Sequence, residues 1–324
     1  MATFSKFIAD DNVLPYATAI MAEADAKGIV SDYWGEDRSK GQMLSWLQHP
    51  EILRYIHGRA TGNPDLSTYQ WFRDQFFPQP VELALTLGCG FGAFERTGIG
   101  IGIANRFEAY DISEGAIESA RESAAAAGMG DCIYYEVRDL DRVELPEQRY
   151  DAIFAISSAH HIFELENMYR QVRRALKPGA LFFLDEYVGP SRFQSSPRVT
   201  ELINRLREVL PERYRRNLFV NDGVTLMGPY MPTPVEHFEK NDPSEAIRSG
   251  ELVPTLKQYF DIVEYRPYGG AILHMLFSGM MGNFDPASET DVALVKLLAL
   301  FEELLEKTGA IESDFAAIVA RPKA

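Results

Sequence analysis

The stretch LALTLGCGFGAFER, residues 83–96, sets three alternating glycines directly behind a run of apolar residues. An apolar run of this length is typical of a buried strand. Glycine lets a ligand approach the backbone closely and allows positive φ angles. A strand, bare loop and helix in this order present open backbone at the carboxyl edge of a parallel sheet, where α/β proteins bind ligands. The stretch therefore predicts a binding loop, and as Gly88-x-Gly90-x-x-Ala93 it also fits a dinucleotide fingerprint.

Strand-like runs alternate with helical patterns from Val81 onward, which predicts a parallel sheet covered by helices. We expect strands at residues 82–87, 107–110, 133–137, 152–156 and 180–185, followed by two more at 261–265 and 315–320. Between the second and third strands, Ser113 is expected to cap a helix that Gly128 ends. A later helix is expected to stop at the sequence Lys-Pro-Gly, residues 177–179, which turns the chain back into the sheet.

Two regions depart from this alternation. Residues 1–80 are helix-like and rich in aromatic residues, and they end at the boundary sequence FFPQP. Residues 190–260 combine a helical stretch with the Pro/Gly-rich sequence MGPYMPTP, and an insertion of this length predicts a lid or binding element. We therefore expect a helical amino-terminal cap (1–80), a ligand-binding core (81–189), a lid insertion (190–260) and a segment that completes the core sheet (261–324).

The sequence DVALVKLLALFEELLEKTG, between the last two expected strands, predicts a helix with one apolar face. That face is expected to pack on the core, and it consists of Leu294, Leu297, Leu298, Phe301, Leu304 and Leu305.

The amino-acid composition disfavours several classes of protein and of partner. The chain has 324 residues with 32 Lys and Arg against 47 Asp and Glu, a formal charge of -15 that disfavours nucleic acid and anionic membranes as partners. Two cysteines cannot build a disulfide framework. The first residues, MATFSKFIADDN, lack the apolar core of a secretory signal, so we expect a cytoplasmic protein. Neither paired Cys/His spacings nor a two-histidine helix motif occurs, so no metal site is predicted.

Acidic residues follow two consecutive strands of the expected sheet. Asp111 ends the second strand, where a carboxylate can accept both hydroxyls of an adenosine ribose. Asp139 ends the third strand, where it can face the amino group of an adenine. Two acids in register beside a glycine loop favour an adenosine ligand over a tight turn without a ligand.

At this point the chain resembles the class I S-adenosylmethionine-dependent methyltransferases, over roughly residues 81–184. LTLGCGFG looks like the glycine loop of the family, EAYDIS like its ribose-binding strand end, and VRDLD like its adenine-side acid. YDAIFAISSAHHI is similar to its fourth strand and ALKPGALFFLDEY to its fifth strand with the preceding turn. Thr86 is a departure, because many members carry an acid there that contacts the amino group of the cofactor.

The resemblance implies an α/β fold: a Rossmann-like, mostly parallel sheet of seven strands with an antiparallel last strand and helices on both faces. It also implies S-adenosyl-L-methionine as the cofactor, laid across the carboxyl edge. The implied cofactor-binding residues are Gly88, Cys89, Gly90, Phe91 and Gly92 at the methionine, Asp111 at the ribose, Ile112, Asp139 and Leu140 at the adenine, and Ser157 after the fourth strand. Arg59 in the sequence GRATGN can meet the methionine carboxylate if residues 1–80 cover the cofactor, and the alternative for it is a surface arginine.

Methyl transfer from a sulfonium is an in-line displacement, so positioning and desolvation carry most of the catalysis. A base is needed only for a hydroxyl or ammonium acceptor. His160, His161 and Glu186 follow the fourth and fifth strands and are the candidate catalytic residues. The alternatives are a shaping role for the histidines and an ordinary loop position for Glu186.

The predicted function is therefore methyl transfer to an oxygen or nitrogen of a small molecule, such as a sugar or a secondary metabolite. A non-catalytic S-adenosylmethionine-binding module is the alternative. A nicotinamide-dependent oxidoreductase would leave Asp139 and the sequence AHHI without a role. A nucleic-acid methyltransferase would be expected to carry an Asn/Asp-Pro-Pro-aromatic motif where ISSAHH stands. The sequence does not predict an oligomeric state.

Overall fold

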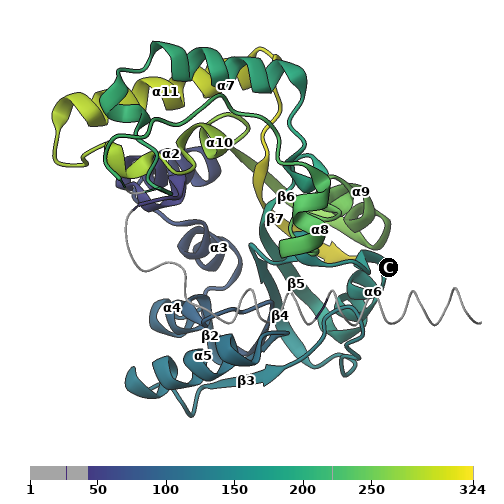
Figure 1. Cartoon of the computed structure of the whole chain (residues 1–324). Coiled ribbons are helices and arrows are strands. Elements are labelled where there is room, and N and C mark those ends of the chain that lie inside the picture. Colours follow the sequence, from purple (N-terminus) through teal and green to yellow (C-terminus); the bar gives the residue numbers. More distant parts are fainter. Residues whose placement is uncertain (1–26, 28–42, 221, 324) are drawn as a thin grey trace, which may run out of the picture.

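The computed structural model describes residues 27, 43–220 and 222–323, and its centre is one seven-stranded sheet (Figure 1). The strands are β1 (Val81–Leu87), β2 (Ala104–Asp111), β3 (Ile133–Val137), β4 (Tyr150–Ile156), β5 (Leu176–Tyr187), β6 (Phe260–Gly269) and β7 (Phe315–Pro322). They lie in the order β3-β2-β1-β4-β5-β7-β6. All seven predicted strands are present, and the predicted fold class is confirmed.

The first five strands run parallel, whereas β7 is antiparallel to both of its neighbours, β5 and β6. β1 lies between β2 and β4, so the order of the strands reverses on either side of it. The carboxyl end of the strand at such a switch point is where open α/β sheets form a ligand crevice.

Helices cover both faces of the sheet because its strands are apolar on both sides. On one face α3 (Thr68–Phe76), α4 (Ala93–Ile101) and α5 (Glu114–Ala126) pack against strand residues such as Phe107 and Phe154. On the other face α6 (Leu165–Ala175) and α9 (Ser249–Tyr259) pack against residues such as Phe182. Since α9 belongs to this layer, the last part of the predicted insertion 190–260 is part of the sheet's covering.

Two helix ends show how well local signals predict structure. The Ser113 side chain accepts a hydrogen bond from the Ala116 N–H and so caps α5, and Gly128 beyond its end has a φ of 70°, both as predicted. α6 spans Leu165–Ala175 and so stops directly before Leu176 and the sequence Lys-Pro-Gly, as predicted to within two residues. Those three residues form the irregular start of β5, where its register with β4 shifts.

A second group of helices lies above one edge of the sheet (Figure 1). It contains η1 (Trp46–Gln48), α2 (Pro50–Thr61), α7 (Pro197–Val209), α10 (Leu273–Phe277) and α11 (Glu289–Lys307). α2 packs against β6 and α11, so part of the predicted cap and the carboxyl-terminal segment share one apolar core. Short elements connect the layers: η2 (Ala159–His161), η3 (Ser191–Phe193), η4 (Glu212–Arg215), α8 (Val235–Asn241) and η5 (Met281–Asn283).

The helix α11 is present as predicted, but its buried face is rotated. Leu297 and Leu304 were expected inside and are 61% and 52% exposed. Glu302 is fully buried instead, because its carboxylate accepts the backbone N–H groups of Gly270, Ile272 and Leu273. Three backbone donors that would otherwise lack a partner thus decide which side of α11 faces inward. Of the helices that the structure describes, none has both the length and the apolar character of a membrane span.

Candidate active site

The glycine loop at the end of β1 is held open by backbone geometry. Gly88, Gly90 and Gly92 all have positive φ angles, of 70°, 49° and 71°. A Cβ on Gly88 would lie 2.4 Å from the Ser158 Cβ, and one on Gly92 would lie 2.3 Å from the Tyr135 hydroxyl. A Cβ on Gly90 would meet no atom within 4 Å. Gly88 and Gly92 are therefore required for packing, whereas Gly90 borders open space.

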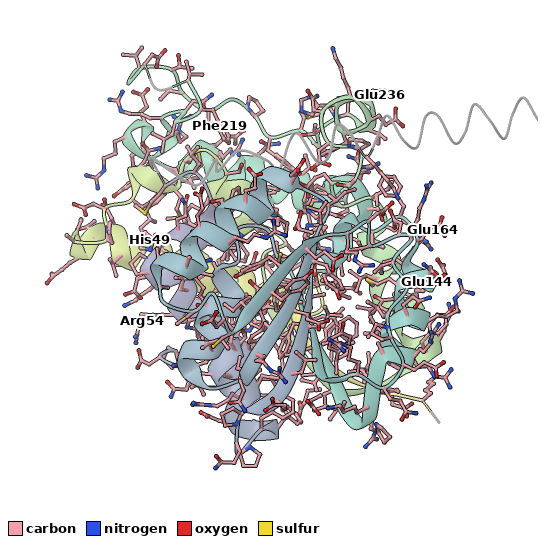
Figure 2. The ribbon with its side chains drawn as sticks, turned by 90° about the horizontal axis from the view of Figure 1, so that it is seen from below. His49, Arg54, Glu144, Glu164, Phe219 and Glu236 are labelled. Carbon is pink, nitrogen blue, oxygen red and sulfur yellow. The ribbon has the colours of Figure 1, made fainter. Side chains whose placement is uncertain are left out.

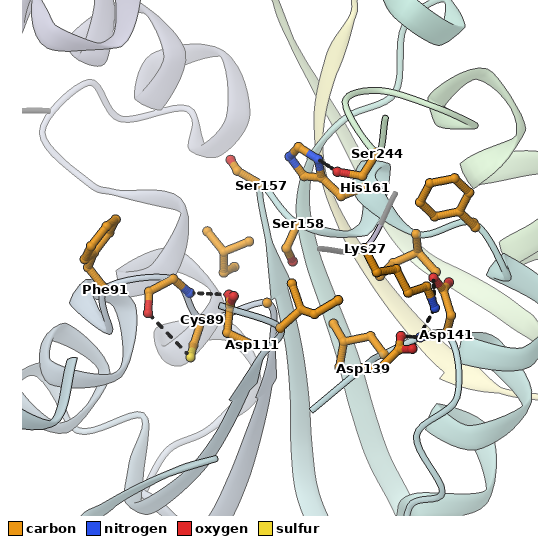
Figure 3. Close-up of a pocket in the computed structure, with 17 residues that line it drawn as sticks. Lys27, Cys89, Phe91, Asp111, Asp139, Asp141, Ser157, Ser158, His161 and Ser244 are labelled. Atoms are coloured by element: carbon orange, nitrogen blue, oxygen red, sulfur yellow. Dashed lines mark hydrogen bonds and ion pairs between the residues drawn. The ribbon is translucent and has the colours of Figure 1, made fainter. Parts of the chain in front are cut away.

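That space is a pocket above the carboxyl ends of β1, β2, β3 and β4 (Figure 3). Nine of the predicted cofactor-binding residues line it: Gly88, Cys89, Gly90, Phe91, Asp111, Ile112, Asp139, Leu140 and Ser157. Gly92 does not line it, because it is the left-handed residue that begins α4 behind the loop. Residues from four strand ends thus form one cavity, as a ligand across the sheet edge requires.

Asp111 has two structural partners in this pocket. Its Oδ2 accepts the Gly90 N–H at 2.8 Å, and its Oδ1 accepts the Ser113 N–H at 2.9 Å. Burial raises the pKa of this carboxyl although both backbone bonds lower it. The carboxylate therefore fixes the glycine loop as well as facing the pocket, a second role that sequence patterns did not predict.

Asp139 meets a lysine from the amino-terminal region at the opposite end of the pocket. The Lys27 Nζ lies 2.6 Å from Asp139 Oδ2 and 3.1 Å from Asp141 Oδ2, and all three residues line the cavity. Asp141 was not singled out by sequence analysis, although it stands in the same VRDLD motif. Its Oδ1 also accepts the Glu164 N–H, so it positions the loop beyond β4.

Arg59 lies elsewhere in the structure. Its guanidinium donates to the Tyr55 hydroxyl at 2.8 Å and pairs with the Glu306 carboxylate, and it does not line the pocket. In Figure 2, Arg54 of the same helix lies across the molecule from Glu144 and Glu164. The structure therefore corrects the predicted contact between Arg59 and a methionine carboxylate. α2 packs on α11, and Arg59 joins these two helices through its pair with Glu306.

Glu186 organises the turn after β4. Its Oε1 accepts the N–H groups of Ser158 and Ala159 at 2.8 and 2.7 Å, and its Oε2 lies 2.7 Å from His160 Nδ1. Both Glu186 and His160 are buried, at 0% and 8% exposure, and neither lines the pocket. Burial lowers the pKa of His160, but the hydrogen bond to Glu186 and the negative charges of Glu186, Glu245 and Asp242 together raise it overall.

His161 does line the pocket (Figure 3). Its Nδ1 lies 3.0 Å from the Ser244 hydroxyl, whose own proton is donated to Asp242 Oδ1 at 2.7 Å. Because the serine proton is used, the imidazole must donate from Nδ1, which leaves Nε2 as an acceptor. Burial lowers the pKa of His161 well below its usual value, and nearby His160 adds to this, so the ring is neutral at neutral pH.

Besides Lys27 and Asp141, three further residues at or near this site were missed by sequence reasoning. Ser244 and Glu245 lie in the predicted insertion, and no local pattern indicated that they meet the turn after β4. Glu95 in the first turn of α4 is fully buried, and neither of its carboxylate oxygens has a hydrogen-bond partner in the described part of the chain. Burial raises its pKa to about 7. Glu95 stands within the stretch 83–96, so this acid directly after the glycine loop was a signal that sequence analysis could have used.

Comparisons with known proteins agree with this geometry. Residues 84–179 match the family model described as a methyltransferase domain. Sterol 24-C-methyltransferase of Yarrowia lipolytica is 26% identical over 212 residues, which are 61% of this chain and 54% of that protein. The 27-O-demethylrifamycin SV methyltransferase of Amycolatopsis mediterranei is 29% identical over 106 residues, 32% of this chain and 38% of that protein. The chain spans about half the length or less of the first curated relatives that it matches.

A solved structure of geranyl diphosphate C-methyltransferase from Streptomyces coelicolor superposes with a TM-score of 0.52 at 12% identity. The superposition covers 92% of this chain and 98% of that one, and it supports the fold. The molecule is thus an α/β protein with a ligand crevice at the carboxyl edge of its sheet. Residues 84–179 match a methyltransferase domain, which agrees with the predicted family of class I S-adenosylmethionine-dependent methyltransferases and with the predicted cofactor.

Proposed function

We propose that this protein transfers a methyl group from S-adenosyl-L-methionine to a small molecule. The observation that carries the proposal is the pocket itself. Its walls bring the glycine loop, Asp111 and Asp139 together at successive strand ends, with the neutral imidazole of His161 at a further wall. A cofactor with a flexible amino-acid end, a ribose and an adenine needs this succession of bare backbone and two acceptors.

The residues present fit this cofactor. Gly90 faces open space that a side chain would fill, and Asp111 retains acceptor capacity beyond its two backbone bonds. In the proposed arrangement Gly90 borders the methionine, Asp111 accepts the ribose hydroxyls, and Asp139 accepts from the adenine between Ile112 and Leu140. The cofactor supplies an electrophilic methyl group on a sulfonium.

The chain's own residues then orient the acceptor and manage its proton. His161 Nε2 is an acceptor at the pocket wall, held in this tautomer by Ser244 and Asp242. It takes the proton of a hydroxyl or ammonium acceptor. Glu186 acts as a positioning residue, because its bonds to two backbone N–H groups and to His160 fix the turn that carries His161.

The acceptor is proposed to be a small molecule, handled in the cytoplasm. The printed names of the relatives include a 24-C- and a 27-O-methyltransferase, so the kind of atom methylated differs among them. The formal charge of -15 disfavours nucleic acid as an acceptor. A module that binds the cofactor without turning it over remains the second candidate, because all the cofactor contacts would be the same.

Turnover separates these two candidates. The purified chain is incubated with S-adenosylmethionine and a panel of hydroxyl and amine acceptors, and S-adenosylhomocysteine formation is measured. Calorimetry with S-adenosylhomocysteine and with NADH tests the pocket independently of the acceptor. Methyl transfer is expected with at least one acceptor, and binding of S-adenosylhomocysteine but not NADH. Tight binding of NADH without S-adenosylhomocysteine binding would refute the proposal.

A further inference from the structure

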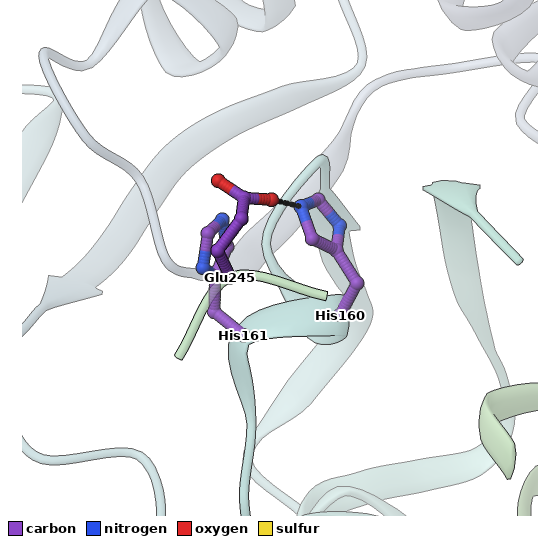
Figure 4. A group of neighbouring side chains, drawn as sticks. All are labelled: His160, His161 and Glu245. Carbon is purple, nitrogen blue, oxygen red and sulfur yellow. Dashed lines mark ion pairs between the residues drawn. The ribbon is translucent and has the colours of Figure 1, made fainter. Parts of the chain in front are cut away.

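Three side chains that can ligate a metal converge beside the pocket. His160, His161 and Glu245 each offer one ligand atom, and these atoms lie within 4.8 Å of one another (Figure 4). The histidines come from η2 after β4, and Glu245 comes from the turn beyond α8. His161 and the neighbouring Ser244 line the pocket, so the cluster borders the space proposed for the acceptor.

Both imidazoles are held in the orientation that metal ligation needs. His160 Nδ1 is 2.7 Å from the Glu186 carboxylate, and its Nε2 is on the side of Glu245, 3.7 Å from Oε1. His161 donates from Nδ1 to Ser244, as derived above, so its Nε2 is the acceptor nitrogen. Histidines that bind metals characteristically donate their other ring N–H to such a partner, which fixes tautomer and ring orientation.

The charges of the cluster call for a cation. Glu186 is fully buried and the Glu245 side chain is 20% exposed, and these two carboxylates flank His160. Arg192 lies nearby and donates to the backbone carbonyls of Pro243 and Glu245, so its positive charge offsets only part of the negative charge around the cluster. Buried charges are costly unless they are paired or coordinate a metal. A divalent ion held by the two imidazoles and Glu245 would balance these carboxylates in place of a proton on His160.

From this convergence we propose that His160, His161 and Glu245 bind one divalent transition-metal ion. Two imidazole nitrogens and one carboxylate oxygen suit Zn²⁺, Co²⁺ or Fe²⁺ better than the oxygen-seeking Mg²⁺. Three protein ligands leave at least one coordination position open, as in catalytic metal sites. Because His161 lines the pocket, we place that position on the pocket side, where an oxygen of the methyl acceptor occupies it.

The part of this inference that concerns the acceptor rests on the proposed methyl transfer. Coordination lowers the pKa of a bound hydroxyl, so its proton is lost to solvent before the oxygen attacks the methyl group. The new bond joins oxygen and methyl carbon, and the carbon–sulfur bond of the cofactor breaks. His161 Nε2 cannot accept a proton and ligate a metal at the same time. Removing the metal therefore distinguishes proton transfer to His161 from proton loss at a metal-bound oxygen.

Metal binding is tested first, without reference to activity. The full chain is treated with a chelator, dialysed and titrated with Zn²⁺ by calorimetry, and with Co²⁺ by visible absorption. One ion per chain is expected to bind. Glu245→Gln and His161→Asn should each weaken it by at least the 10- to 100-fold that loss of an outer-shell partner costs. His237→Asn removes an exposed histidine on α8 and should change nothing.

Stoichiometric binding by the wild type that both ligand variants lose, with unchanged circular dichroism, supports the site. Absence of binding by the wild type overturns it, and so does binding that survives both substitutions. In the second measurement, methyl transfer is followed after chelation. Loss of turnover that Zn²⁺ or Co²⁺ restores supports coordination of the acceptor. Full turnover of a metal-free chain overturns the proposal that the metal coordinates the acceptor, but it does not contradict the proposed methyltransferase activity.

Discussion

Replacing Asp111 with alanine removes the carboxylate on which the proposed ribose contact depends. In the free protein this side chain accepts two backbone N–H groups, from Gly90 and Ser113. Those two hydrogen bonds are the same in the free and the cofactor-bound protein, so they contribute nothing to the free energy of binding. Their loss lowers mainly the stability of the fold. The ribose bonds, in contrast, contribute to binding. A charge-assisted hydrogen bond contributes about 1.5–3 kcal/mol, so the expected loss is about 2 kcal/mol or more, about 30-fold in Kd.

Calorimetric titration with S-adenosylhomocysteine measures this loss, on variants whose thermal unfolding shows that they are folded. Asp111→Asn keeps the shape and one acceptor oxygen, so its Kd should lie between those of the wild type and Asp111→Ala. Asp131→Ala removes an exposed acid outside the pocket and serves as the matched control. A folded Asp111→Ala chain that binds within twofold of the wild type would show that Asp111 holds only the loop.

Gly90→Val should abolish S-adenosylhomocysteine binding, because its side chain enters the open space of the pocket and because a β-branched residue strains the loop at a φ of 49°, while the chain should still fold since an added Cβ meets no atom within 4 Å. His161→Asn should lower turnover about 10²-fold with little change in cofactor affinity, because Asn cannot replace the imidazole nitrogen. Proteolysis at the sequence MGPYMPTP, residues 227–234, should slow when cofactor and acceptor are present if the insertion closes as a lid. Glu95→Gln should stabilise the fold at alkaline pH. The raised pKa of Glu95 means that its favourable contribution is present below about 4.5 and is lost as pH rises through about 7, at a cost of about 3 kcal/mol.

Each of these outcomes has a measurement that can contradict it. Normal cofactor binding by Gly90→Val would remove the glycine loop from the site, and near-normal turnover of His161→Asn would show that His161 is not the proton acceptor. Equal cleavage rates with and without ligands would argue against a lid. For Glu95→Gln, urea unfolding at pH 5 and pH 8 gives the stability difference from the wild type, and a difference that does not grow with pH would contradict the assignment.

The sheet and the pocket walls could be predicted because their signals are local. Apolar strands, the glycines and the acids at strand ends all lie within a few residues of one another along the chain. Ser113 is an example of a cap predicted from its position alone. Such features are fixed by backbone geometry and hydrogen bonding within one strand–loop–helix unit, so the sequence carries them without knowledge of the rest of the fold.

The features that sequence reasoning missed are long-range. Glu302 turns α11 because it caps backbone donors some thirty residues away, which no helical period reveals. Arg59 was placed at the cofactor because its region was expected to cover it, whereas Glu306 holds it elsewhere. Glu245 meets His160 only because the chain returns to η2 after α8. In each case a charged side chain finds its partner through the tertiary fold.

The position of β7 has a consequence for how the protein is made. This strand follows all the others in chain order, yet it pairs between β5 and β6 with antiparallel hydrogen bonds on both sides. While a ribosome still holds residues 315–322 in its exit tunnel, the facing edges of β5 and β6 have no neighbour. Unpaired edges invite pairing with other nascent chains. We therefore expect β5 and β6 to be the segments that chaperones protect during synthesis, until residues 315–322 have emerged and β7 can pair between them.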